Sequence, residues 1–158
     1  MEPLETVIAR TVVKAHVDAH AKYLRDATDA VGIVLTTAWA ERFPTNAGVY
    51  AVFDGKKLIY VGETGSLRGR MKDLRDTRNH TLRRQIGAAK FRDCNGYQPG
   101  TSKRKFPESI EGMLNAYIEK NLSVKVLPVL LGRKEIEERL IDDETPRFNI
   151  KTRRGDAE

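Results

Sequence analysis

The stretch that decides the fold is GVYAVFDGKKLIYV, residues 48–61. Residues 48–53 and 57–61 are rich in β-branched and aromatic side chains, which favour extended strands. Asp54-Gly55-Lys56 separates the two runs, and a polar break that contains glycine is typical of a β-hairpin turn. The sequence therefore predicts a pair of antiparallel strands at its centre.

Helical periodicity surrounds this hairpin, because apolar residues recur at steps of three and four. Helices are predicted for residues 4–29, 67–75, about 82–89, 108–120 and 133–143, with Ser66 as the N-cap of the second. Residues 123–131 predict a third strand, residues 31–45 a connector that could hold a short strand or helix, and residues 148–150 a short extended piece.

The long helix predicted at the start of the chain carries one apolar stripe. Its members, three or four residues apart, are Leu4, Ile8, Val12, Ala15, Ala19 and Tyr23. Such a helix also fits an interaction domain that docks a partner protein through this stripe.

Composition and charge limit the classes of protein to which the chain can belong. The chain has 158 residues, of which 40% are apolar, enough for a buried core. It carries 28 basic and 22 acidic residues, a formal charge of +6, and the excess gathers in residues 68–84, 103–105 and 151–154. Basic clusters of this kind favour a polyanionic partner. No apolar run is long enough to cross a membrane. An acidic start without a signal peptide and a single cysteine lead us to expect a cytoplasmic protein.

Several motifs along the chain resemble those of the GIY-YIG nucleases. In order they are Gly48-Val49-Tyr50, Tyr60-Val61-Gly62, Leu67-Arg68-Gly69-Arg70, Glu137 followed by Leu140-Ile141, and Pro146-Arg147-Phe148-Asn149. The resemblance implies an α+β fold with a small three-stranded antiparallel sheet flanked by helices, and cleavage of phosphodiester bonds with a divalent metal, Mg²⁺ or Mn²⁺. We therefore expect a nuclease domain over residues 44–151, a helical extension over residues 1–43 and a basic, polar tail over residues 152–158.

Glu137 is the candidate metal ligand. At about 100° per residue, it lies inside the apolar arc of Ile136, Leu140 and Ile141, whereas Glu138 lies on the opposite side. A carboxylate that faces a core is costly unless it is paired, hydrogen-bonded or bound to a metal. Glu137 could instead reach out from the edge of the arc or pair with an arginine, but the resemblance favours a metal-binding role.

Arg70 is the candidate for charge stabilisation in the transition state, because it flanks the apolar stripe of its helix and can lean toward the sheet. The alternative is an ordinary solvated arginine. The other basic residues expected to contact nucleic acid are Arg68, Arg75, Arg83, Arg84, Lys103, Arg104 and Lys105.

The two motif tyrosines, Tyr50 and Tyr60, impose a geometric test. Side chains alternate faces along a strand, so these two share a face only if the hairpin loop has an odd number of residues. Asp54-Gly55 alone favours a two-residue loop, which would place the tyrosines on opposite faces. The resemblance requires a shared face, so we expect a three-residue loop with Gly55 in the left-handed conformation.

The resemblance also implies that a tyrosine hydroxyl, from Tyr50 or Tyr60, activates the attacking water. A free tyrosine has a pKa of about 10, so it needs a cation or proton acceptor nearby. His80 is the expected acceptor, although it could simply begin the next helix. Asn149 would help to order the site by hydrogen-bonding Tyr60 or a phosphate. Glu63 departs from the lysine of excision-repair relatives at this position, and it either weakens phosphate binding or lies outside the site.

The sequence thus predicts a metal-dependent endonuclease, with DNA favoured over RNA as substrate. A catalytically silent nucleic-acid-binding module of the same fold is the alternative, as is a nuclease subunit that needs a partner for specificity. A homodimer or a partner protein could supply that specificity, and no membrane partner is expected.

Overall fold

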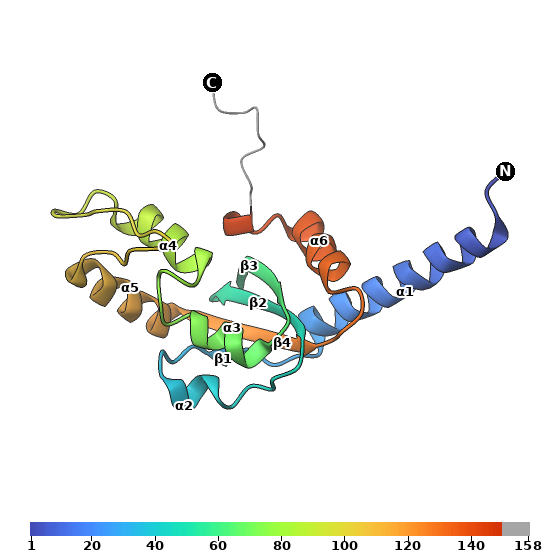
Figure 1. The fold of residues 1–158 in the computed structure, drawn as a ribbon, viewed down its shortest axis with the longest axis horizontal. Coiled ribbons are helices and arrows are strands. Elements are labelled where there is room, and N and C mark those ends of the chain that lie inside the picture. Colours follow the sequence, from blue (N-terminus) through green and yellow to red (C-terminus); the bar gives the residue numbers. More distant parts are fainter. Residues whose placement is uncertain (150–158) are drawn as a thin grey trace, which may run out of the picture.

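A four-stranded antiparallel sheet forms the centre of the computed structural model, which describes residues 1–149 (Figure 1). The strands are β1 (Val31–Gly32), β2 (Gly48–Asp54), β3 (Lys57–Thr64) and β4 (Leu122–Pro128), in the order β1-β4-β2-β3. The predicted α+β fold is confirmed. The expected three strands gain a fourth, β1, because two residues of the connector pair with the beginning of β4.

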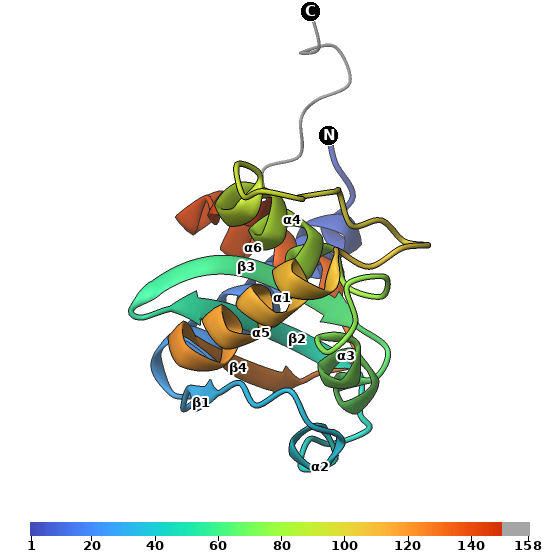
Figure 2. The same cartoon turned by 90° about the vertical axis from the view of Figure 1, so that its left-hand side faces the viewer.

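Helices cover both faces of this sheet (Figure 2). They are α1 (Leu4–Asp26), α2 (Thr37–Ala40), α3 (Leu67–Asp73), α4 (Thr81–Phe91), α5 (Glu108–Asn121) and α6 (Arg133–Glu144), followed by the 3₁₀ helix η1 (Arg147–Asn149). The face that carries Tyr50, called the tyrosine face below, packs against α2 to α5, whereas α1 and α6 pack against the opposite face. Phe148 and Asn149 were expected to be extended, but they belong to η1, and residue 150 lies outside the described residues.

The hairpin loop is shorter than expected. Asp54 pairs with Lys57, so Gly55 and Lys56 form a two-residue loop, with Gly55 at a φ of +59°. The prediction of a three-residue loop is therefore wrong. The pairing then shifts, since Val52 faces Tyr60 while Phe53 faces Leu58.

This shift is a β-bulge in which Ile59 is the extra residue of β3. Ile59 and Tyr60 consequently both pack on the tyrosine face, and the alternation resumes with Val61 on the opposite face. The predicted shared face of Tyr50 and Tyr60 is confirmed, but the bulge produces it instead of the loop.

The long N-terminal helix is confirmed, and it ends three residues earlier than predicted, at Asp26. It packs on the sheet through Val17, Ala21 and Leu24, which are almost fully buried. The first half projects away from the rest of the molecule (Figure 1). The predicted apolar stripe lies on the other side of the helix, and its large members are exposed.

The segment before residue 44 contributes to both cores. Ile33, Trp39 and Phe43 are buried on the tyrosine face, while α1 covers the opposite face. The division into an extension and a nuclease domain stays a prediction, and the predicted tail, residues 152–158, lies outside the described residues. Within residues 1–149, no helix combines the length and the apolar character that crossing a membrane requires.

Candidate active site

The centre of the candidate site is the hydroxyl group of Tyr50, which lies on β2 with only 1% of the residue exposed. Its oxygen is 3.0 Å from Nε2 of His80 and accepts a hydrogen bond of 3.2 Å from Nε of Arg70. The sheet, α3 and the start of α4 thus each bring one side chain to this point. Arg70 and His80, which follow Tyr50 by 20 and 30 positions in the sequence, meet it as predicted.

His80 is the N-cap of α4, and this position fixes which ring nitrogen carries the proton. The backbone N–H of Leu82 donates to Nδ1 of His80 over 3.1 Å, so Nδ1 must hold a lone pair. Burial, followed by the charges of Arg70, Arg84 and Arg83, lowers the pKa of His80 well below its usual 6.5. The neutral ring therefore carries its proton on Nε2 and donates it to the Tyr50 oxygen.

Tyr50 and Tyr60 lie side by side but differ in their access to solvent. Their ring centroids are 6.0 Å apart, and Tyr60 is 5.7 Å from the His80 ring. Burial raises the pKa of Tyr50 far above 10, Tyr60 raises it further, and Arg70 opposes both. Tyr60 is only half-buried, so it is the tyrosine that an incoming water can reach.

Arg70 is held on both sides. Its Nη1 donates to Asp73 over 3.2 Å and to the backbone oxygen of Asn79 over 2.9 Å, while Nε donates to Tyr50. Asp73 was not singled out from the sequence, although its place three residues after Arg70 on a helix is the spacing of a side-chain pair. The guanidinium is therefore aimed at the tyrosines, not left free as an ordinary surface arginine.

Gly62 makes room for Tyr50. The two residues face each other across β2 and β3, and a Cβ atom at Gly62 would overlap Cζ and the hydroxyl of the Tyr50 ring. A side chain here would push the ring away from His80 and Arg70. The motif glycine is thus a steric requirement of the tyrosine beside it.

Asn149 was expected to hydrogen-bond Tyr60 or a phosphate. Its side chain instead accepts from the N–H of Val61 over 2.7 Å and donates to the C=O of Val61 over 2.8 Å. The amide thereby ties η1 to the edge strand at the residue next to Tyr60. Its described contacts position the strand, since both of its polar atoms bind backbone.

Glu137 lies on α6, half-buried beside the buried Ile136 and Leu140, as the periodicity predicts. The helix packs along β3, the strand that carries Tyr60 and Gly62, from the side opposite the tyrosine face. Glu63, which stands where excision-repair relatives are expected to carry a lysine, pairs with Arg133 at 3.3 Å. Glu63 faces Val49 across the hairpin, so its side chain belongs to the opposite face and lies outside the tyrosine cluster.

One of the basic residues assigned to nucleic-acid contact is misassigned. Arg83 is only 1% exposed, and its guanidinium binds Glu111 over 2.5 Å and the backbone oxygen of Leu74 over 3.1 Å. Arg83 therefore joins α4 to α5 and to the end of α3 from inside the protein. The sequence misled here because a buried, paired arginine and a surface arginine look alike without their partners.

Three of the other basic residues donate hydrogen bonds to groups of the protein itself. Arg68 donates to the backbone oxygen of Phe43 over 2.9 Å, Arg75 donates to Thr37 over 2.6 Å, and Arg84 donates to the backbone oxygen of Thr77 over 2.9 Å.

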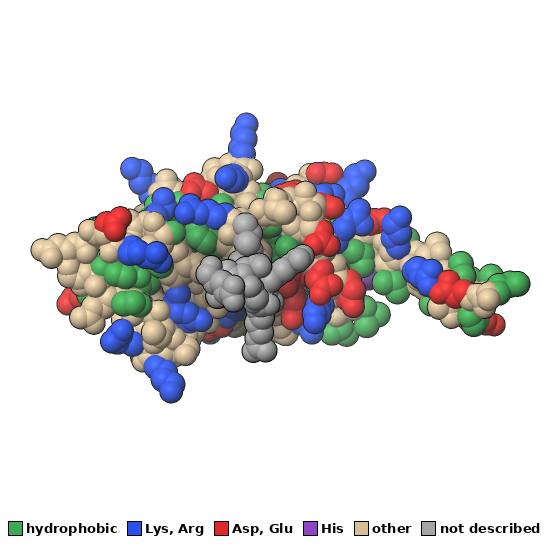
Figure 3. Space-filling view, turned by 90° about the horizontal axis from the view of Figure 1, so that it is seen from above, with side chains coloured by type: hydrophobic (Ala, Val, Ile, Leu, Met, Phe, Trp, Pro, Cys, Tyr) green, Lys and Arg blue, Asp and Glu red, His purple; other side chains and the backbone are tan. Residues whose placement is uncertain are grey.

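The loop before α5 holds the most open of these charges: Lys103, Arg104 and Lys105 are all exposed. Lys and Arg side chains gather on this end of the molecule in Figure 3. The basic surface expected for a polyanion is thus carried mainly by this loop and the rims of α3 and α4.

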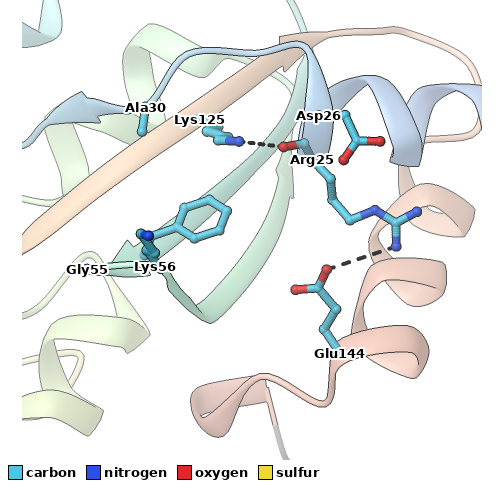
Figure 4. A pocket seen from close by; sticks show the side chains of 8 residues that line it. Arg25, Asp26, Ala30, Gly55, Lys56, Lys125 and Glu144 are labelled. Carbon is cyan, nitrogen blue, oxygen red and sulfur yellow. Dashed lines mark hydrogen bonds and ion pairs between the residues drawn. The ribbon is translucent and has the colours of Figure 1, made fainter.

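A pocket of about 430 Å³ lies away from the tyrosine cluster, between the end of α1, the hairpin loop and the end of α6 (Figure 4). Three of its charged side chains make contacts within the protein. Lys125 donates to the backbone oxygen of Arg25 over 2.6 Å, and Arg25 pairs with Glu144 at 3.9 Å. The tyrosine cluster, where a buried hydroxyl meets an arginine and a histidine, is the candidate active site.

A comparison with known proteins identifies the family of the chain. The sequence model of the GIY-YIG catalytic domain matches residues 40–157. The chain belongs to the GIY-YIG family. No curated protein matches it in sequence.

Among solved structures, it is similar to the GIY-YIG N-terminal endonuclease domain of UvrC from Thermotoga maritima. A point mutant of that domain bound to its catalytic divalent cation has 15% identity and a TM-score of 0.42. The magnesium-bound domain has 14% identity and a TM-score of 0.40. Each alignment covers 72% of this chain and 93% of the other.

Replacement of Gly62 by alanine is expected to destabilise the protein by about 1–3 kcal/mol, because the added methyl group overlaps the Tyr50 ring in a buried site. The measurement is chemical denaturation followed by circular dichroism. Gly112→Ala is the matched control, since a Cβ atom there meets nothing within 4 Å and alanine favours the helix. Equal stability of the Gly62 variant and the wild type would contradict the packing described here.

His80 predicts a pH dependence of stability. The folded state keeps the ring neutral, so the unfolded state binds one more proton below pH 6.5, and stability is lost as the pH falls. Between pH 7.5 and 5.5 this residue is expected to cost on the order of 1 kcal/mol of stability. His80→Asn, which can still cap α4, should lose correspondingly less over that interval in urea titrations. Parallel pH profiles for both proteins would show that His80 titrates normally.

Proposed function

We propose that this protein is a divalent-metal-dependent endonuclease that hydrolyses phosphodiester bonds in DNA. The observation that carries the proposal is the buried Tyr50 hydroxyl, bound by N–H groups of Arg70 and His80 and lying beside the half-exposed Tyr60. Packing alone needs no cationic group and no histidine around a tyrosine hydroxyl. A site that moves a proton at an oxygen next to a phosphate needs both.

The accessible Tyr60 is our candidate for the general base. In this scheme Tyr60 acts as its phenolate, with its hydroxyl proton released to solvent. The phenolate oxygen takes a proton from water as the water oxygen bonds to phosphorus, and the ester oxygen leaves and takes up a proton from solvent. Tyr50 supports Tyr60 by hydrogen bonding, because Arg70 and His80 already supply two donors to the Tyr50 oxygen and leave its own hydrogen for its neighbour. Arg70 balances the negative charge that develops at the phosphate.

His80 serves in this scheme as a hydrogen-bond donor. The proton acceptor suggested by the sequence would need a lone pair on Nε2, but Leu82 occupies the lone pair of Nδ1 and leaves the proton on Nε2. A neutral donor to Tyr50 is also consistent with the lowered pKa of the ring.

Glu137 is the proposed metal ligand. Within residues 1–149, histidine, cysteine and acidic side chains form no group of three or more that could hold an ion. A single carboxylate completed by water and phosphate oxygens suits Mg²⁺ or Mn²⁺, which keeps several waters. When bound, the ion polarises a phosphate oxygen and stabilises the leaving group.

DNA is the favoured substrate, and the exposed Lys103, Arg104 and Lys105 are the residues best placed to follow its backbone. A cytoplasmic location, suggested by the single cysteine, stays a prediction. A catalytically silent binding module of the same fold would bind DNA through the same surface. It would not need two hydrogen-bond donors, from Arg70 and His80, at the Tyr50 hydroxyl.

Glu137→Gln should abolish metal-dependent nicking of supercoiled plasmid, with a loss of at least about 100-fold, while DNA binding survives. The assay compares Mg²⁺, Mn²⁺ and EDTA. Glu138→Gln is the control, because that residue is exposed on the next position of the same helix. Salt-dependent binding without cleavage by the wild type, on plasmid and on structured RNA, would favour the binding module.

Tyr60→Phe should lower the cleavage rate by roughly 100-fold or more and leave unfolding free energy almost unchanged, because Tyr60 is the proposed base. Tyr50→Phe removes the acceptor of two buried N–H donors and should cost about 1–3 kcal/mol of stability. Rates come from single-turnover cleavage and stabilities from urea denaturation. Near-normal cleavage by Tyr60→Phe would move the base to Tyr50.

A further inference from the structure

The outer side of α1 is an extended apolar surface. The residues of the predicted stripe, called the outer stripe here, are Leu4, Ile8, Val12, Ala15, Ala19 and Tyr23. Leu4, Ile8, Val12 and Tyr23 are 69%, 53%, 62% and 56% exposed. The helix touches the sheet through the reverse side, so the outer stripe takes no part in holding α1 to the protein.

Exposure of this surface is unfavourable in water. The projecting half of α1 shows hydrophobic side chains toward its tip, among charged ones, in Figure 3, and Val7 and Val13 flank the stripe at 41% and 51% exposure. The loop before α6 adds Leu130 and Leu131, 71% and 73% exposed, and Nε2 of His16 lies 2.8 Å from the Leu131 oxygen. Continuous apolar patches of this kind mark interaction surfaces in otherwise polar proteins.

Successive residues of the outer stripe are separated by four, four, three, four and four positions. The spacing is therefore the same when read in either direction along the helix. Two α1 helices can therefore lie antiparallel about a two-fold axis between Val12 and Ala15. Ile8 of one copy then faces Ala19 of the other, and Val12 faces Ala15, so a larger side chain meets a smaller one in each pair. Leu4 faces Tyr23 at both ends.

Two hollows in the surface lie where this arrangement needs them. One of about 300 Å³ is lined by Ala19, His20, Tyr23 and Leu127, and another of about 280 Å³ is lined by Ala19, Lys22, Tyr23, Asp26 and Ala27. The antiparallel arrangement brings Leu4 and Ile8 of the second copy to these positions. The projecting half of the helix, which covers nothing on its own molecule, would thus cover the other copy.

We infer that α1 is a homodimer interface, in which two copies pair their outer stripes antiparallel and insert Leu4 and Ile8 into each other's hollows. A helix of 23 residues is about 35 Å long and about 10 Å wide, a footprint of roughly 350 Å² per copy. Stable dimers bury about 800 Å² per partner. The hollows around Tyr23 and the Leu130–Leu131 loop lie beside the stripe and would add to this area.

The first test is sedimentation equilibrium of the full chain between about 1 and 100 µM. The dimer interface predicts a rise in mass from 17.8 kDa toward twice that value. Ile8→Asp should weaken association at least about 100-fold, because it places a charge in the paired stripe. Thr6→Asp is the control, since Thr6 is exposed on the other side of the projecting half.

A monomer throughout that range, or equal effects of Ile8→Asp and Thr6→Asp, would overturn the inference. Both changes lie in the part of α1 that projects from the body, so thermal unfolding should be unaltered and loss of folding should not mimic loss of association. The readout is independent of DNA cleavage.

The second test fixes the direction of pairing by cross-linking in a Cys94→Ser background. Ile8→Cys mixed with Ala19→Cys should form a disulfide dimer at least about 10-fold faster than either variant alone. Each variant by itself places its two cysteines eleven residues out of register, about 16 Å along the helix. Equal rates in the mixture and in the separate variants would exclude the antiparallel arrangement.

Discussion

The extra residue in β3, Ile59, decides which face of the sheet Tyr60 occupies, and the candidate site depends on that choice. With the two-residue loop alone, Tyr60 would lie among the residues under α1 and α6, separated by the sheet from Tyr50, His80 and Arg70. The bulge restores the shared face and brings the two rings to 6.0 Å. Gly62 then has to lack a side chain, because the resumed alternation points it at the Tyr50 ring.

Buried and partly buried charged side chains hold the segments around this hairpin in place. Arg83 and Glu111 form a pair inside the protein, and Arg83 also holds the backbone at the end of α3. That anchor lies three residues from His80, so it fixes the turn from which the imidazole reaches Tyr50. Burial first, and then the charges of Arg70, Arg84 and Arg83, oppose protonation of His80 and keep the ring a neutral donor. The positive charges of Arg70 and Arg83 therefore stabilise the geometry of the site through contacts inside the protein.

The sequence was sufficient to predict the helices, the hairpin and the meeting of Tyr50, Arg70 and His80, because periodicity and motif order are local signals. It failed where the outcome depends on a partner far along the chain. The bulge at Ile59 arises from packing of both strands and leaves no mark in the residues of the turn. Arg83 differs from its neighbours only through Glu111, which lies 28 residues later. The role of Asn149 depends on the backbone of Val61, which has no side-chain signature.

The clasp of Asn149 on Val61 has a consequence for solubility and assembly. A side-chain amide offers one donor and one acceptor, so it occupies the outer edge of β3 much as a neighbouring strand would. At the other edge of the described sheet, β1 is only two residues long. The amide thus blocks the outer edge of β3 at Val61, and the short β1 leaves little edge on the other side, so both edges of the described sheet offer a limited template for a foreign strand.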